Sequence, residues 1–151
     1  MYPKQHLFLG IIFTTFLFIF FPEIGIAGIS IILSSTVFID VDHYIYYIYK
    51  KKDWSLINAY KNSMEKTKKL FSLSRKKRNG IYLGFYFLHG IEILFLVLAL
   101  SFFSKYFLFV FAGFSFHLLL DIIHQTTYWD RIDKFSLIYD YIKFKDKKSI
   151  F

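Results

Sequence analysis

Histidine and acidic side chains recur within or beside the apolar runs of this sequence, where ionisable groups are costly. The chain has five His and no Cys, so strong metal ligands can come only from His and carboxylates, and thiolate nucleophiles are excluded. A charged side chain at the centre of a bilayer costs about 2.5–3.5 kcal/mol on insertion scales, so each such residue is a candidate functional residue. The candidates are His6, Asp40, Asp42, His43, His89, Glu92, His117, Asp121 and His124.

The spacing of the later candidates predicts shared helix faces. His117, Asp121 and His124 stand at i, i+4 and i+7, so in a helix they form one stripe. His89 and Glu92 are three residues apart and are expected on one face of the preceding helix.

The earlier candidates lie at the edges of apolar runs. Asp40 and His43 are also three residues apart, and Asp42 points elsewhere in a regular helix unless it turns inward where the helix ends. His6 opens the first apolar run.

Histidine and carboxylate ligands without sulfur favour a hard or borderline divalent ion, zinc, manganese or iron. The candidates exceed one four-coordinate shell, which indicates either two ions or one ion whose His ligands are oriented by carboxylates. A water activated by such an ion can attack an ester or phosphoester. We expect Asp42, His43, His89, His117 and Asp121 as direct ligands, His6 and His124 as further ligands, and Asp40 and Glu92 as general acid or base groups.

The elements that position these residues follow from the composition. The 151 residues are 56% hydrophobic and 23% aromatic, which excludes a disordered chain. The long apolar runs argue against a soluble globule, because a small core could not bury them. We predict one all-α membrane domain over 1–151, a four-helix bundle of two helical hairpins. Its helices are expected at about 4–21, 24–43, 81–103 and 106–124. Turns fall at Pro22-Glu23 and Ser104-Lys105. A signal peptide ending near Ala27 is the alternative for the first run.

The net charge of +8 is concentrated between and after the apolar runs. Segment 44–80 carries eleven Lys and Arg, and the tail 125–151 carries six. The positive-inside rule therefore predicts a multi-pass protein of the cell (inner) membrane with both termini, the segment 44–80 and the tail in the cytoplasm. The nine candidates then share one layer near the cytoplasmic surface. The charges flank apolar runs and no base-stacking platform accompanies them, so no nucleic-acid partner is expected.

Segment 44–80 is expected to include an amphipathic interfacial helix. Asp53 can cap its start, and five largely apolar or aromatic positions fall on one face at helical spacing, namely Ile57, Tyr60, Met64, Thr67 and Phe71. A solvated loop with a helical turn is the alternative.

Four short motifs in this order resemble the YdjM-like family of membrane-bound, predicted metal-dependent hydrolases. They are Gln5-His6-Leu7, Phe38-Ile39-Asp40-Val41-Asp42-His43, Leu88-His89-Gly90-Ile91-Glu92 and the Gly113 to Asp121 block with His117. The chain departs from the family pattern in having Ile39 where a Pro precedes the acidic motif, His89 with Glu92 in place of a His-Arg-x-x-Thr-His element, and His124 where Thr is common.

The resemblance and the co-layered candidates together predict a metal-dependent hydrolase at the cytoplasmic leaflet. Its expected partners are membrane lipid and a lipid, lipid-linked or small-molecule substrate. The alternatives are a haem-binding bundle with His89 and His117 as axial ligands, an ion-coupled transporter, and a structural membrane subunit. The identity and number of the metal ions and the oligomeric state stay open.

Overall fold

The computed structural model describes residues 3–74, 77–78, 81, 84–129, 132 and 135–146. This part of the chain is helical and contains no strand, as expected from the sequence. The elements are α1 (Pro3–Phe20), the 3-10 turn η1 (Pro22–Ile24), α2 (Gly25–Phe38), α3 (Val41–Lys51), α4 (Leu56–Ser72), α6 (Ile91–Leu100), α7 (Lys105–Trp129) and α8 (Leu137–Asp146).

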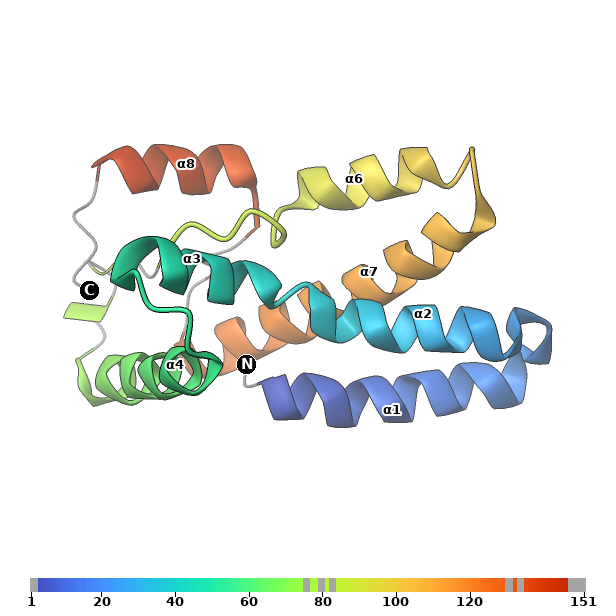
Figure 1. Ribbon diagram of the computed structural model, residues 1–151, viewed down its shortest axis with the longest axis horizontal. Helices are drawn as coiled ribbons and strands as arrows, with labels where there is room; N and C mark the ends of the chain where they lie inside the picture. Colours follow the sequence, from blue (N-terminus) through green and yellow to red (C-terminus); the bar gives the residue numbers. More distant parts are fainter. Residues whose placement is uncertain are drawn as a thin grey trace.

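Three helical stretches in the described part of the chain are long and apolar enough to cross a membrane: Pro3–Phe20, Pro22–Lys51 and Lys105–Tyr128. They contain α1, α2 with α3, and α7, and α2 packs against both α1 and α7 (Figure 1). Large apolar side chains point outward from them, such as Phe8 at 64% and Ile26 at 76% exposure. Outward apolar surface of this kind is what lipid contacts, so the chain has the helices of a membrane protein.

Small residues let α2 approach the other long helices closely. A Cβ atom on Gly113 of α7 would lie 2.5 Å from the carbonyl oxygen of Ile32, and one on Gly28 of α2 would lie 2.9 Å from the Phe109 ring. Close backbone approach through small residues is the usual packing of membrane helices. The Phe13 and Phe116 rings stack at 4.1 Å between α1 and α7. These contacts, which we call the apolar layer, hold the three helices together on one side of the polar candidates.

The second predicted helix, 24–43, ends in the wrong place. The structure ends α2 at Phe38, turns at Ile39 and Asp40, and continues as α3 to Lys51. Short-range backbone hydrogen bonds, from Asp40 N to the Val37 carbonyl at 3.2 Å and from His43 N to the Asp40 carbonyl at 3.1 Å, mark this break. The first part of segment 44–80 is therefore helical, and Asp40 lies between two helices.

The third predicted helix, 81–103, is wrong in its length. Residues 84–90 are not helical, and 82–83 lie outside the described residues. The reason is local: Gly84 has φ of +147° and Gly90, the N-cap of α6, is extended with φ of −100° and ψ of 146°. The ten residues of α6 reach about 15 Å, half of a bilayer core. Four spanning helices are expected, but the described part of the chain contains three that are long enough. The helix α6 is apolar but shorter.

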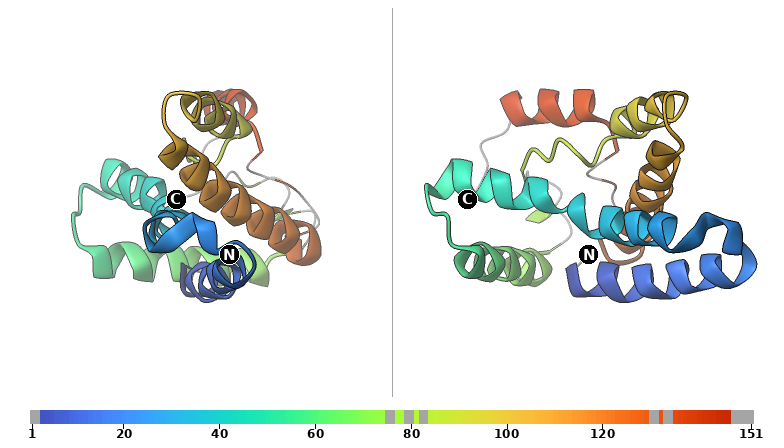
Figure 2. Two further views of the ribbon diagram at one scale, coloured as in Figure 1. Left: turned by 90° about the vertical axis from the view of Figure 1, so that its right-hand side faces the viewer. Right: turned by 45° about the vertical axis from the view of Figure 1, so that its right-hand side comes forward.

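The remaining predictions of helices hold with small shifts. The first expected helix, 4–21, is α1, and the last, 106–124, is the longer α7. The tail contains α8, whereas residues from 147 onward lie outside the described residues. Figure 2 shows α6 and α8 along one side of the molecule, opposite α1 and α4.

The amphipathic segment is a helix, α4, and the loop alternative is wrong. Its N-cap is Ser55, whose hydroxyl oxygen accepts from Asn58 N at 3.3 Å. Asp53 instead fastens the α3–α4 turn, because its carboxylate accepts hydrogen bonds from the Tyr47 hydroxyl at 2.7 Å, from Ser55 N and from the Asn58 amide. The bond from Tyr47, followed by those from Ser55 and Asn58, holds the pKa of Asp53 below its usual value.

Candidate metal centre

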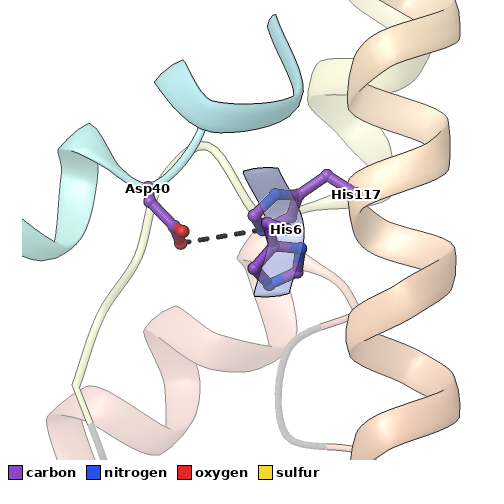
Figure 3. A group of neighbouring side chains, drawn as sticks. All are labelled: His6, Asp40 and His117. Carbon is purple, nitrogen blue, oxygen red and sulfur yellow. Dashed lines mark ion pairs between the residues drawn. The ribbon is translucent and has the colours of Figure 1, made fainter. Parts of the chain in front are cut away.

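The polar cluster lies where α1 begins, where α2 gives way to α3, and along the second half of α7. Six of the candidates meet there in three overlapping groups whose ligand atoms lie within 4.8 Å of one another. The groups are His6 with Asp40 and His117, Asp40 with His43 and His89, and His89 with His117 and Asp121. Figure 3 shows the first group, in which Asp40 points toward the stacked rings of His6 and His117.

Asp40 is central to the cluster. Its Oδ1 atom lies 3.6 Å from the Nε2 atoms of three imidazoles, those of His43, His89 and His117. The break between α2 and α3 places this carboxylate at the end of α2. If the helix were continuous through this point, the Asp40 side chain would point in a different direction.

Two of these imidazoles are held in a defined orientation from behind. His117 Nδ1 lies 2.7 Å from the carbonyl oxygen of Thr36, and because a carbonyl can only accept, Nδ1 donates. His89 Nδ1 likewise donates to Asp42 Oδ2 at 2.8 Å. Both rings therefore turn Nε2, with its lone pair, toward Asp40. His117 is fully buried, and its Nε2 has no hydrogen-bond partner within the described residues.

Asp121 and His6 close the other side of the cluster. Asp121 Oδ2 lies 3.8 Å from the Nε2 atoms of both His89 and His117. Its Oδ1 lies 3.2 Å from His6 Nε2, and the His6 ring stacks on His117 at 3.7 Å with an interplanar angle of 12°. The predicted stripe on α7 thus brings His117 and Asp121 into one group.

These residues fit a divalent metal ion. Ligands bound to zinc at about 2.0–2.2 Å in a tetrahedron lie roughly 3.3–3.6 Å apart, close to the separations around Asp40 Oδ1. The buried Nε2 of His117 and the Oδ2 of Asp40, both without hydrogen-bond partners in the described part of the chain, are costly in an apolar setting unless something binds them. The buried His and Asp groups can therefore hold a metal ion.

Asp42 lies behind a ligand candidate and is not a member of the three groups. It is fully buried, and its Oδ2 accepts from both His89 Nδ1 and the backbone nitrogen of Leu88. Asp42 is buried, as expected if it turns inward, and it lies in the first turn of α3, directly after the break that ends α2. A carboxylate on the far nitrogen of a ligating His fixes that ring and raises its basicity.

Glu92 engages a different part of the molecule. Its carboxylate accepts from the Ser136 hydroxyl at 2.6 Å and from Leu137 N at 2.9 Å, at the start of α8. The predicted helix face shared with His89 is wrong, because α6 begins at Ile91 and His89 lies in the turn before it. Glu92 belongs to none of the three groups.

The other two histidines lie at the edge of the cluster. The His43 side chain is 31% exposed and its ring stacks on Tyr86 at 3.8 Å. His124 packs against Tyr128, with ring centroids 4.9 Å apart, and is not in the three groups. Both histidines line a cavity beside the cluster.

Thr36 and Tyr86 contribute to the cluster and were not among the sequence candidates. Thr36 acts through its main-chain carbonyl, which no side-chain pattern reveals. Tyr86 stands three residues before His89 in an aromatic run, and nothing in that run distinguishes it from its neighbours.

The pair proposed as axial haem ligands is too close for that role. The His89 and His117 rings meet edge to face, with centroids 5.3 Å apart and an interplanar angle of 75°. This contact leaves no room for a porphyrin between them, so the arrangement disfavours the haem alternative.

Comparisons of the chain with models of known protein families, with curated proteins and with solved structures find no match.

Proposed function

We propose that this chain is a membrane-bound, metal-dependent hydrolase that cleaves an ester or phosphoester at the cytoplasmic leaflet. The observation that carries the proposal is the convergence of three imidazole Nε2 atoms on Asp40 Oδ1, each at 3.6 Å. The three rings come from α3, the turn before α6, and α7, so no local sequence requirement explains the convergence. The resemblance of the motifs to the YdjM-like family supports the same reading.

The donor set favours zinc or manganese. Nitrogen and carboxylate oxygen ligands without sulfur suit both ions. Asp40, His89 and His117 each belong to two of the three groups, so the groups overlap and can serve one ion or two neighbouring ions. A metal count per chain distinguishes these two arrangements.

The residues around the ion have separable tasks. Divalent ions in such sites supply Lewis-acid activation of water and of the scissile carbonyl or phosphoryl oxygen. Asp40 lines the adjacent cavity, and we assign it the acceptance of a proton from water. His124 also lines the cavity, lies outside the three groups and can donate a proton to the leaving group.

The membrane setting directs the choice of substrate. Three apolar helices carry the cluster at one end of the bundle, and the basic segment 44–80 follows it in the chain. With the positive-inside rule, this basic segment supports our proposal that this end faces the cytoplasmic leaflet of the cell membrane. A lipid or lipid-linked ester reaches such a site by lateral diffusion.

The proposal is tested on protein purified in detergent without added chelator. We expect elemental analysis to find one or two zinc or manganese ions per chain, and we expect chelation to abolish hydrolysis of nitrophenyl ester or phosphodiester reporters, with recovery on adding metal. His117→Ala removes both metal and activity, whereas Glu92→Gln, outside the cluster, keeps both. Wild-type protein that is metal-free and indifferent to chelation contradicts the proposal.

A further inference from the structure

A cavity of about 360 Å³ opens beside the metal cluster. Asp40, His43 and His124 form one part of its wall, and α3 and α4 supply most of the rest. The cavity therefore connects the α3–α4 pair to the candidate ligands. Its size is that of a small-molecule site, which ranges from about 300 to 1,000 Å³.

The wall of this cavity is mainly aromatic and apolar. Tyr46, Tyr47 and Tyr60 contribute rings, and Leu70 and Phe71 of α4 contribute aliphatic and aromatic surface. Such a lining suits a hydrocarbon chain.

A positive group stands within this apolar wall. Lys66 is the only cationic side chain among the described residues that line the cavity, and it is half-buried. Its Nζ lies 5.7 Å from the Tyr46 ring centroid, and Lys50 Nζ lies 5.9 Å from the same ring. Two ammonium groups on one ring make this part of the cavity attractive to an anion.

Charge repulsion supports the same conclusion. Burial, followed by the charges of Lys51 and Lys50, lowers the pKa of Lys66. A bound anion would relieve that repulsion and favour the charged ammonium.

Another part of the wall has the opposite charge. Asp40 lines the cavity there, and His43, which also lines it, lies 3.9 Å from Asp42 Oδ1 through its Nε2. Contacts between rings connect the two parts: Tyr46 lies 5.5 Å from Tyr86, which stacks on His43. Lys66 is therefore the part of this wall where an acidic group on a ligand meets a positive charge.

We propose that the cavity binds a phosphate-bearing amphiphile, with the phosphate at Lys66 and its apolar chain between the tyrosines, and that this is the class of molecule presented to the metal centre. The last step rests on the proposed hydrolase function, whereas the binding itself does not. The shared chemistry is a phosphate, and a lipid headgroup differs from free phosphate in needing the apolar wall.

The test uses dodecyl phosphate as the probe and full-length protein in dodecyl maltoside, which has the same chain with a neutral headgroup. Native mass spectrometry counts bound dodecyl phosphate across a titration. We expect saturable binding of one molecule, about tenfold weaker in Lys66→Gln, because a charge-assisted hydrogen bond is lost. Lys66→Arg should restore it, and Lys68→Gln, a change at an exposed lysine of the same helix, should leave it unchanged.

The outcomes separate the two proposals, since metal content is measured in the same samples. Equal binding by wild type and Lys66→Gln overturns the assignment to Lys66, whether or not metal is present. Competition by inorganic phosphate at equal concentration overturns the requirement for an apolar chain. Binding that depends on Lys66 in a protein without metal supports this cavity and overturns the hydrolase.

Discussion

The three long helices are held together in two different ways along their length. In the apolar layer, glycine and phenylalanine bring α1, α2 and α7 into direct contact, as at Gly113 against Ile32 and Phe13 against Phe116. In the cluster, the same helices meet through His and Asp side chains. Apolar packing alone explains the apolar layer. The cluster buries polar atoms, which costs free energy of desolvation that helix packing does not require. A bound ion would offset that cost, whereas helix packing alone gives no reason for it.

The largest effect is expected from Asp40→Ala. This change removes the oxygen on which three imidazoles converge, so we expect bound metal to fall to less than about one-tenth of the wild-type amount. Elemental analysis of the purified variant measures this. The helices should persist by circular dichroism, because the apolar layer is untouched. Wild-type metal content in this variant would show that the cluster is a packing feature.

A smaller loss is expected from Asp42→Asn. The amide can still accept from His89 but lacks the charge that raises ring basicity, so metal affinity should fall about 10–100-fold. Competition with a fluorescent chelator gives the affinity. Asp53→Asn in the α3–α4 turn is the matched control, since it removes the same charge outside the cluster. An equal loss of affinity in both variants would argue for a general charge effect.

The apolar layer is tested by Gly113→Ala. The added Cβ would lie 2.5 Å from the Ile32 carbonyl oxygen, so α2 and α7 must separate. Overpacking of this kind costs about 1–3 kcal/mol, seen as a lower unfolding temperature in detergent. Ala27→Leu enlarges an exposed position of α2 and should leave the temperature unchanged. If Gly113→Ala is as stable as wild type, the close approach of α2 and α7 does not limit stability.

The smallest effect on metal is expected from Glu92→Gln. Its carboxylate fastens the start of α8, so the variant should keep full metal content. It should lose protection of α8 in hydrogen exchange, because hydrogen bonds to a carboxylate are stronger than those to an amide. Loss of metal in this variant would place Glu92 in the site after all.

Helical spacing in the sequence correctly predicted which candidates lie together where the helix is unbroken. His117 and Asp121 meet as their four-residue spacing indicates, because α7 is unbroken through both. The same reasoning failed for His89 and Glu92, because the helix begins after His89. Apolar runs show where membrane helices occur, but the run at 81–103 gives no strong signal that Gly84 and Gly90 interrupt it.

Two further features could not be read from side-chain types. The break at Ile39 and Asp40 lies in a run whose composition suits continuous helix. The partner of His117 is the main-chain carbonyl of Thr36, which any residue at that position would offer. Tertiary packing determines both, so only the arrangement of helices in space reveals them.

The contact between His6 and Asp121 joins positions 115 residues apart, one in the first long helix and the other in the last. During synthesis, His6 emerges long before Asp121 exists, so the complete cluster forms only after the last long helix has joined the first. Metal captured there would fasten the beginning of the chain to its final apolar helix. Bound metal would then indicate that all three long helices have inserted into the membrane. A chain whose synthesis stops before Asp121 could not form this contact.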